Sequence, residues 1–304
     1  MKIVVAGGSG FIGEPLVKRL TARGDDVAVL SRNPAKVRAG RGVQWDGKSA
    51  GEWTGEVDDA DAIINLAGEN IGEGRWTETR KRKLVDSRLN ATNALVDALS
   101  TKQRTANREA RTTFISASAV GYYGYDRDDE LDESSRKGTG FLADLSDSWE
   151  TAAKRAEGFT RLVILRFGVV LAADGGALQK MMLPFRFGAG GRVGDCMEWM
   201  SWIDRDDLLD AIEWSLRSND VRGIYNVTSP QPVRNRDFAT QLGQVMHRPS
   251  FLPAPSFALR LLFGDMAEET LLGGQRVVPR RAQAEGFRFA HGTLDSALRN
   301  VINR

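Results

Sequence analysis

The sequence is poor in the residues that build disulfides and metal centres. Its 304 residues include one cysteine, Cys196, and two histidines, His247 and His291. A single cysteine excludes an intramolecular disulfide and a metal site built from several cysteines. Neither histidine has a second histidine or a cysteine at helical spacing along the chain. We therefore expect both histidines to be structural and the protein to hold no metal.

Long apolar runs and a net charge of one sign are also missing. The longest apolar run, 162–173, is interrupted by Arg166 and is too short to cross a bilayer. The first six residues lead directly into glycines, without the apolar stretch and cleavage site of a secretory signal. Lysine and arginine (42) nearly balance aspartate and glutamate (40), whereas nucleic-acid binders usually carry a basic domain or stripe. We expect a cytoplasmic protein without a membrane or nucleic-acid partner.

Short apolar runs alternate with longer amphipathic stretches through the first half of the chain. The expected strands are 3–6, 27–30, 62–66, 113–116 and 162–165, and the expected helices are 13–23, 76–100 and 145–157. Because the strands are apolar on both faces, they fit a parallel sheet covered by helices on two sides. This order predicts an α/β fold with a doubly wound parallel (Rossmann) sheet.

The pattern changes after residue 170. We expect a helix over 176–187, a strand over 198–203, a helix over 204–216 and a strand over 224–227 that returns to the main sheet. From Pro230 onward the chain is expected to be mostly helical. The predicted Rossmann domain is 1–170, with 199–229 returning to it. The predicted smaller, mostly helical C-terminal lobe comprises 171–198 and 230–304.

A glycine-rich turn joins the first expected strand to the first expected helix. Residues 6–13 satisfy both G-x-x-G-x-x-G and G-x-G-x-x-G. Gly7 permits the tight turn, Gly10 lets the backbone approach a pyrophosphate, and Gly13 allows close helix–strand packing. Free N–H groups at the start of the helix then face the anion. The sequence predicts a dinucleotide site formed by Gly7, Gly10, Phe11, Ile12 and Gly13, with a purely structural turn as the alternative.

The end of the second expected strand selects the cofactor. An NAD site places an acidic residue there to bind the ribose 2′-hydroxyl, but this strand ends in Ser31 and Arg32. Arg32 can pair with a 2′-phosphate through its planar guanidinium, and Ser31 can donate a further hydrogen bond. Asp25 and Asp26 precede the strand and lie at its far end. The sequence therefore favours NADP(H), with a solvated Arg32 as the alternative.

These motifs resemble the extended short-chain dehydrogenase/reductase superfamily, and most closely its atypical nucleoside-diphosphate-sugar epimerase-like branch. The resembling segments are 65–71, 75–76, 87–88, 165–171, 183–186, 201–203, 207–208, 247–249 and 274–279. They cover nearly the whole chain, including the small C-terminal domain typical of that branch. The resemblance implies that the adenine-side segment Leu66, Ala67 and Gly68, together with Arg88, also contacts the cofactor.

The resemblance also reveals a missing catalytic pair. Catalytic members of the superfamily use a serine and, one helix later, Tyr-x-x-x-Lys, in which the lysine lowers the pKa of the tyrosine. Ser118 matches the serine, but Trp149 stands where the tyrosine belongs and Ala153 where the lysine belongs. Lys154 is one position off and points about 100° around the helix axis. No tyrosine in the chain has a lysine four residues later.

Two tyrosines close to Ser118 could compensate for this loss. Tyr122 and Tyr123 follow the serine directly, and either could supply a phenol near the nicotinamide. Buried aromatic packing is the alternative role for both. The catalytic candidates of the sequence are therefore Ser118 and Tyr123, without the usual helical pair.

Two functions fit these observations. The first is an NADP(H)-dependent oxidoreductase or epimerase-like enzyme, acting on a small or nucleotide-linked substrate at the carboxyl ends of the strands. The second is a non-catalytic NADP(H)-binding regulator or redox sensor, because some relatives of the branch are linked to cell or plastid division. The resemblance further implies a homodimer through the fourth and fifth helices.

Overall fold

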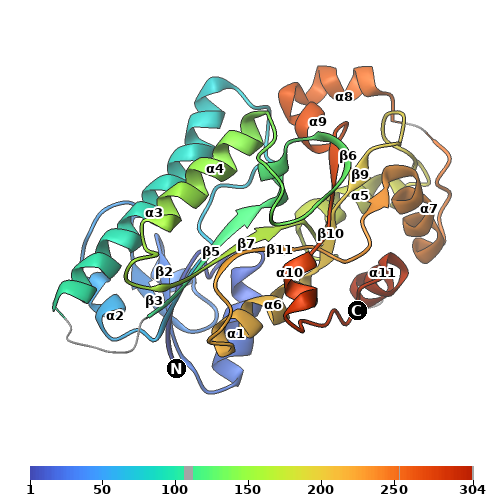
Figure 1. Cartoon of the computed structure of the whole chain (residues 1–304). Coiled ribbons are helices and arrows are strands. Elements are labelled where there is room, and N and C mark those ends of the chain that lie inside the picture. The colour runs from blue at the N-terminus through green and yellow to red at the C-terminus, as the bar shows by residue number, and fades with distance from the viewer. Residues whose placement is uncertain (106–111, 253, 303–304) are drawn as a thin grey trace.

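Seven parallel strands form the central sheet of the protein (Figure 1). The computed structural model describes residues 1–105, 112–252 and 254–302. In spatial order the strands are β3 (Arg41–Gln44), β2 (Asp26–Ser31), β1 (Lys2–Ala6), β4 (Ala62–Asn65), β5 (Thr113–Ala119), β7 (Arg161–Phe167) and β11 (Gly223–Val227). The chain order reverses between β1 and β4, which is the topological switch point where such sheets bind ligands. The predicted doubly wound Rossmann fold is confirmed.

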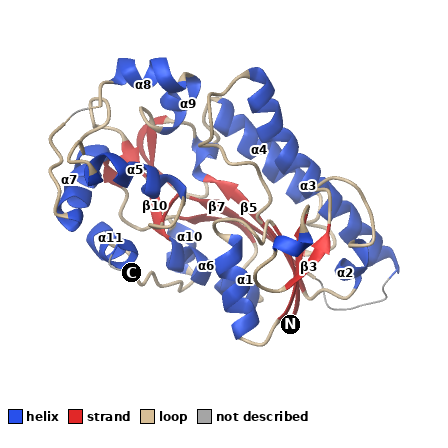
Figure 2. Cartoon of the chain, turned by 180° about the vertical axis from the view of Figure 1, so that it is seen from behind, coloured by secondary structure: helices blue, strands red, loops and turns tan. Residues whose placement is uncertain are grey.

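Helices cover both faces of this sheet, as Figures 1 and 2 show. One face carries α1 (Gly13–Ala22) and α6 (Arg205–Arg217), and the other carries α2 (Thr54–Asp58), α3 (Glu78–Thr105) and α4 (Phe141–Lys154). Alternate residues of β1 enter the two layers: Ile3 and Val5 pack under α1, whereas Val4 and Ala6 face α3. The two-sided burial explains why the strands are apolar on both faces.

The second lobe combines helices with short two-stranded sheets. Its helices are α5 (Gly176–Arg186), α7 (Asn235–Met246), α8 (Ser256–Phe263), α9 (Asp265–Thr270) and α11 (Leu294–Ile302). The helix α10 (Arg280–Ala284) instead packs against β11, and its Ala282 belongs to the same buried cluster as α1 and α6. The small sheets pair β8 (Val169–Leu171) with β10 (Trp202–Asp204), β9 (Trp199–Met200) with β12 (Val233–Arg234), and β6 (Asp126–Leu131) with β13 (Gly274–Val277). Two 3₁₀ turns, η1 (Pro34–Lys36) and η2 (Val120–Tyr123), complete the described elements.

The expected strand over 198–203 is divided at Ser201. The first part, β9, pairs with β12, and the second, β10, pairs with β8, so neither joins the central sheet. Ser201 is tied to β13: its Oγ donates to Gln275 O (2.7 Å) and accepts from Val277 N–H (2.8 Å). These bonds fix the point at which the chain stops pairing with β12 and starts pairing with β8. An apolar run alone does not predict such a change of strand partner. The expected strand over 224–227 is β11, which pairs with β7.

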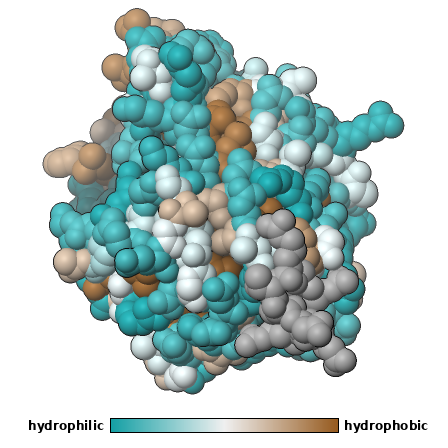
Figure 3. All heavy atoms as spheres, turned by 90° about the vertical axis from the view of Figure 1, so that its left-hand side faces the viewer, coloured by the Kyte–Doolittle hydropathy of each residue, from teal (hydrophilic) through white to brown (hydrophobic). Residues whose placement is uncertain are grey.

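The surface of the described residues separates polar and apolar regions. Figure 3 shows that the side of the molecule on the left of Figure 1, where α3 lies, is mostly hydrophilic with a narrow apolar strip. The exposed large apolar side chains, Met1 aside, lie in the second lobe at Leu183, Phe187, Met197, Phe251, Leu252, Phe257, Leu261 and Leu262. No helix in the described part of the chain is long and apolar enough to span a membrane.

Candidate functional site

The glycine turn between β1 and α1 packs directly against the carboxyl end of β4. Gly7 has a φ of +79°, and a Cβ at this position would lie 2.7 Å from the carbonyl carbon of Leu66. A Cβ on Gly13 would lie 2.2 Å from the carbonyl oxygen of Gly7. A side chain at either position would collide with backbone, so the turn requires glycine for its close packing.

The same turn leaves backbone donors at the start of α1. Gly10 N–H donates to Gly7 O (3.0 Å), and Glu14 N–H donates to Gly10 O (2.9 Å). Within residues 1–105, 112–252 and 254–302, no protein acceptor receives the N–H of Phe11 or of Ile12. Unpaired N–H groups at a helix start carry a partial positive charge and suit an anion. The geometry is that of a phosphate cradle.

Ser31 and Arg32 lie at the carboxyl end of β2, beside this turn. The Arg32 side chain is 80% exposed, and its guanidinium comes within 3.9 Å of Glu69 Oε1. The Ser31 hydroxyl oxygen accepts a hydrogen bond from Asn33 N–H (3.1 Å). Arg32 is thus solvated, with its charge at the sheet edge where the second strand of a Rossmann unit meets the cofactor ribose.

The segment after β4 continues the cradle toward α3. Ala67 N–H donates to the side chain of Asn65 (3.2 Å), which holds the segment in place. The side chain of Arg88 packs closely against Gly68, because a Cβ there would lie 3.1 Å from Arg88 Cζ. The Arg88 guanidinium donates to Leu84 O (3.1 Å) and lies 5.1 Å from the Trp149 ring centre.

Arg88 is a partly buried cation without a bonded carboxylate among the described residues. Burial lowers the pKa of Arg88 to about 10, so the side chain stays protonated at neutral pH. The charge of Glu69 opposes this shift, but a buried cation without a bonded counter-ion is still unfavourable. An anionic ligand beside Gly68 would supply the missing negative charge.

Ser118 and Tyr123 belong to one buried network centred on Glu150 and Arg166. Ser118 Oγ donates to Glu150 Oε1 (2.7 Å), and Arg166 binds both carboxylate oxygens through Nε (2.7 Å) and Nη2 (2.8 Å). Arg166 Nη1 also donates to Tyr123 Oη, which lies 2.8 Å from Asn226 Oδ1. Ser118, Arg166 and Asn226 stand in register on the adjacent strands β5, β7 and β11. Strand register therefore brings the network together.

Ser118 and Tyr123, the two catalytic candidates predicted from the sequence, are both buried in this network. Tyr123 is 0% exposed, and its hydroxyl also lies 2.8 Å from Asp132 O. Burial, only partly offset by Arg166, raises the pKa of Tyr123 to about 12. Ser118 is 2% exposed. The two hydroxyls lie in one network, but each is already hydrogen-bonded inside the protein.

The positions of the missing helical pair on α4 are filled by packing. Trp149 is buried, and its indole N–H donates to Thr92 Oγ1 (2.9 Å). Ala153 is fully buried, and its methyl group adds no polar atom to the site. The Lys154 ammonium lies 4.0 Å from Glu150 Oε2 and is 40% exposed, consistent with its position one residue around the helix. Trp149 thus fills space rather than supplying an acid.

The structure adds Glu150, which the sequence did not point to, and gives Tyr122, one of the two tyrosines considered from the sequence, a defined place. Glu150 neutralises Arg166, and the signal was an arginine inside the otherwise apolar run of β7. Tyr122 stacks on Arg166, with the guanidinium carbon 3.6 Å from the ring centre. Its hydroxyl has no hydrogen-bond partner in the described part of the chain. Tyr122 is half-buried, which makes it the more accessible phenol of the two.

One group of possible metal ligands lies apart from this network. Donor atoms of Asp204, Asp206 and His291 come within 4.8 Å of one another. Arg19 already pairs with Asp206 (2.6 Å), and Asn300 donates to Asp204 (3.0 Å). The group was not foreseen because its members are far apart in sequence. Its existing bonds explain the cluster as a structural contact between α6 and the C-terminal segment.

Comparison with known proteins gives matches along nearly the whole chain. The family described as "NAD dependent epimerase/dehydratase family" matches residues 3–228, and "Domain of unknown function (DUF1731)" matches residues 254–301. The human epimerase family protein SDR39U1 is 36% identical over 305 residues, covering 99% of this chain and 100% of that protein. The Bacillus subtilis epimerase family protein YfhF is 38% identical over 306 residues, covering 99% and 98%.

Solved structures agree with these matches. The crystal structure of human SDR39U1 (isoform 2) with NADPH covers 100% of both chains, with a TM-score of 0.87 and 34% identity. The Thermus thermophilus UDP-glucose 4-epimerase complex with NAD has a TM-score of 0.76 at 18% identity, over 100% of this chain and 98% of that chain, and shows the fold alone. The resemblance to atypical extended short-chain dehydrogenases is thereby confirmed, and the chain belongs to the NAD-dependent epimerase/dehydratase family.

Proposed function

We propose that the protein binds NADP(H) at the carboxyl edge of its central sheet and acts as an oxidoreductase or epimerase-like enzyme. The observation that carries the proposal is the glycine turn, in which Phe11 and Ile12 present N–H groups beside β4 that no acceptor among the described residues receives. The residues fit a dinucleotide, because Gly7 and Gly13 have no side chain and so allow the close backbone packing that such a turn needs. The human relative crystallised with NADPH supports the choice of cofactor.

Each part of the cradle has a role in this proposal. The pyrophosphate is bound by the turn, at Gly7, Gly10, Phe11, Ile12 and Gly13. Ser31 and Arg32 bind the 2′-phosphate, while Leu66, Ala67, Gly68 and Arg88 bind along the segment after β4. Bound nicotinamide would exchange a hydride with a carbonyl or alcohol of the substrate. The substrate, small or nucleotide-linked, would enter between the Rossmann domain (1–170 and 199–229) and the smaller lobe (171–198 and 230–304).

The buried network changes the roles proposed for Ser118 and Tyr123. Their hydroxyls are hydrogen-bonded inside the protein, so we assign both to positioning Arg166 and the turn η2. Tyr122 is the phenol that remains available to a substrate, because its hydroxyl has no partner in the described residues. In this proposal Tyr122 moves the proton that the helical tyrosine moves in other members of the superfamily.

A second function is favoured by the replacement of the helical pair. Trp149 and Ala153 are buried where the tyrosine and lysine would stand, and neither can transfer a proton. A non-catalytic NADP(H)-binding regulator or redox sensor needs the cradle but not the acid. The hypothesis of a link to cell division belongs to this second function.

Two measurements on the purified protein test the proposal. Titration with NADPH and NADH, followed by nicotinamide fluorescence, should show NADPH binding at least about tenfold tighter, or about 1.4 kcal/mol. Bound NADPH is then incubated with aldehydes and ketones, and bound NADP⁺ with alcohols and nucleotide-sugars, while the nicotinamide absorbance and any epimerised sugar are followed. Hydride transfer or epimerisation with any member supports the enzyme, and tight binding without either supports the regulator. Failure of both cofactors to bind would overturn the proposal.

A further inference from the structure

One carboxylate lies among three arginines at the edge of the proposed cofactor site. Glu69 follows Gly68 in the segment after β4, and its Oε1 lies 3.9 Å from Nη1 of Arg32. Its other oxygen, Oε2, accepts a hydrogen bond from Nη1 of Arg80 at 3.3 Å. The charge of Glu69 also acts on the buried Arg88. Glu69 therefore serves cations from the end of β2 and from α3.

These arginines have no other carboxylate within ion-pair distance in the part of the chain that the structure describes. Arg80 is only 18% exposed, and its Nη2 donates to Asn70 O (2.5 Å). The Nε of Arg80 is buried without a hydrogen-bond partner among the described residues. Three guanidinium groups around one carboxylate leave two positive charges without balance.

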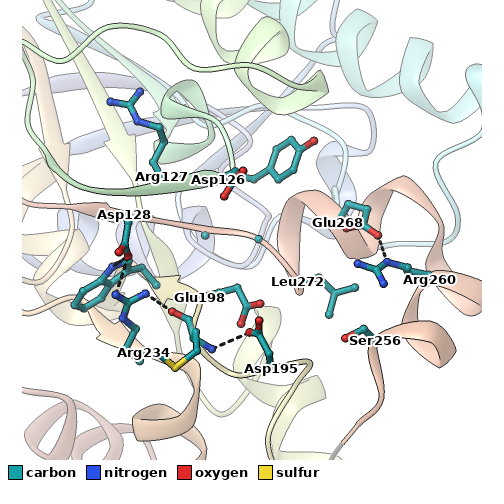
Figure 4. Close-up of a pocket in the computed structure, with 15 residues that line it drawn as sticks. Asp126, Arg127, Asp128, Asp195, Glu198, Arg234, Ser256, Arg260, Glu268 and Leu272 are labelled. Atoms are coloured by element: carbon teal, nitrogen blue, oxygen red, sulfur yellow. Dashed lines mark hydrogen bonds and ion pairs between the residues drawn. The ribbon is translucent and has the colours of Figure 1, made fainter.

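The cavity in the second lobe shows the opposite arrangement (Figure 4). It measures about 580 Å³, and two of its lining arginines each have a carboxylate of their own. Arg234 Nη2 lies 2.7 Å from Asp128 Oδ1, and Figure 4 also draws the pair formed by Arg260 with Glu268. Because unbalanced positive charge attracts anions, the group around Glu69 suits an anionic ligand better than this cavity does.

The unbalanced charge matches the group by which NADP(H) differs from NAD(H). A phosphomonoester carries about two negative charges at neutral pH and three acceptor oxygens. Arg32 is 80% exposed and its contact with Glu69 is long. Exposed ion pairs of this kind contribute little to stability. Arg32 can therefore exchange Glu69 for the 2′-phosphate, while Glu69 keeps Arg80 as its partner.

Glu69 itself is fixed to α3 through its backbone. Its N–H donates to Ser87 Oγ (3.0 Å), and Ser87 Oγ in turn donates to Leu84 O (3.1 Å). Since Arg80 belongs to the same helix, α3 holds both the backbone and the carboxylate of Glu69. The negative charge is thereby kept next to Arg32 and next to any phosphate that Arg32 binds.

We infer that Glu69 and Arg80 set how strongly the site prefers NADP(H) over NAD(H). Glu69 competes with the 2′-phosphate for Arg32 and repels it, which weakens the preference. Arg80 is a positioning residue: it draws the Glu69 carboxylate toward α3 and so limits both effects. The inference rests on the proposed function, because it concerns the 2′-phosphate of the proposed cofactor.

The test is a fluorescence titration of the full chain with NADPH and NADH, expressed as the ratio of the two dissociation constants. Glu69→Gln keeps the shape of the side chain and removes its charge. This variant should raise the preference for NADPH at least about threefold, the effect of a unit charge about 4 to 6 Å away even in water. An unchanged or lower preference would overturn the inference.

Glu73→Gln is the matched control, in the same segment after β4. Glu73 is exposed and accepts a hydrogen bond from Asn70. It has no arginine within ion-pair distance among the described residues. Glu73→Gln should therefore keep the wild-type ratio. A rise equal to that of Glu69→Gln would reduce the effect to the net charge of the protein and overturn the inference.

A double-variant cycle tests the role of Arg80. Arg80→Gln should lower the preference at least about threefold, because Glu69 loses the partner that holds it. In Glu69→Gln/Arg80→Gln this loss should vanish, since no carboxylate remains to be held. A loss that persists in the double variant would mean that Arg80 acts directly on the phosphate and would overturn its positioning role. If urea denaturation shows that Arg80→Gln does not fold, the ratio for Glu69→Gln decides alone.

The same titrations distinguish the inference from the proposed function. NADPH binding by the wild type, with an unchanged ratio in Glu69→Gln, overturns the inference and leaves the proposed function standing. A raised ratio in Glu69→Gln without hydride transfer to any substrate supports the inference and removes only the enzymatic part of the proposed function. Failure of both cofactors to bind the wild type overturns both.

Discussion

Arg166 and Glu150 form a bidentate ion pair, with Nε–Oε1 at 2.7 Å and Nη2–Oε2 at 2.8 Å, and solvent reaches almost none of either side chain. The pair joins β7 of the central sheet to α4, one residue beyond the tryptophan that replaces the usual tyrosine. Although burial alone would lower the pKa of Arg166, its bonds to Glu150 and Tyr123 raise it. The charge on Arg166 is therefore permanent, and the network depends on Glu150 to balance it.

Replacing Glu150 with glutamine should destabilise the protein strongly. The substitution leaves the buried Arg166 without its carboxylate, and breaking a buried pair in this way costs roughly 3 to 5 kcal/mol. Urea denaturation of wild type and variant measures the difference. Glu157→Gln, at an exposed position just beyond α4, is the matched control and should stay within about 0.5 kcal/mol of wild type. A loss below about 1 kcal/mol in Glu150→Gln would show that Arg166 finds another partner.

The raised pKa of Tyr123 predicts that the folded protein loses stability at alkaline pH. Because the folded protein raises this pKa from 10.0 to about 12, the folded state keeps a proton that the unfolded chain releases. The resulting stability is complete below pH 10 and is lost as the pH rises toward 12, by about 1.4 kcal/mol per unit. The unfolding free energy of wild type, minus that of Tyr123→Phe, should therefore fall across this range. A difference that stays constant from pH 9 to 12 contradicts the assignment.

Gly13→Ala tests the steric argument for the glycine turn. The new Cβ would lie 2.2 Å from Gly7 O, so the turn must open, at a cost of about 1 to 3 kcal/mol. NADPH affinity should fall at least about tenfold, because the N–H groups of Phe11 and Ile12 move with it. Gly55→Ala is the control: a Cβ there meets nothing within 4 Å, and alanine in a helix is neutral or stabilising. Unchanged NADPH binding in Gly13→Ala would rule out this turn as the phosphate site.

The features that the sequence predicted are those set by local chemistry. Strands buried on two faces must be apolar throughout, so β1, β2, β4, β5 and β7 could be recognised without any tertiary information. β3 was missed because it is a short edge strand with exposed ends, and β6 because charged residues dominate it. Both owe their strand geometry to their neighbours, β2 and β13, and not to their own composition.

The same division holds for the site. The glycine turn was predictable because its steric requirement lies within eight residues of sequence. The network of Ser118, Glu150, Arg166 and Asn226 was not, because it depends on the register of three strands and on the packing of α4. The arginine inside the apolar run of β7 indicated that some carboxylate must face it, but not which one. Tyr122 could be separated from Tyr123 only once their hydrogen bonds were known.

Arg32→Ala tests the choice between NADPH and NADH. If the guanidinium binds the 2′-phosphate, the variant should lose the preference for NADPH while keeping its affinity for NADH, because a charged contact made only by NADPH is removed. Arg38→Ala is the matched control, since Arg38 is as exposed as Arg32 and makes one long contact, at 4.0 Å, with Glu14. Fluorescence titration of both variants with both cofactors gives the result. A preference that survives in Arg32→Ala would mean that another group reads the 2′-phosphate.

Tyr122→Phe and Tyr123→Phe separate a proton-transfer role from a structural one. The Tyr122 hydroxyl makes no hydrogen bond within the described part of the chain, so the free energy of unfolding of this variant should stay within about 0.5 kcal/mol of wild type. Its kcat for NADPH oxidation should nevertheless fall about 100-fold or more, the usual contribution of an acid or base, with NADPH affinity unchanged. Tyr123→Phe should instead lose about 1 to 3 kcal/mol of stability, since it leaves Arg166 and Asn226 with unsatisfied groups. If the two variants lost kcat equally at equal stability, the phenol of Tyr122 would have no special role. If only Tyr123→Phe lost kcat, the proton would have to pass through the buried network. Ser118 and Tyr123 would then be the catalytic residues, as the sequence predicted.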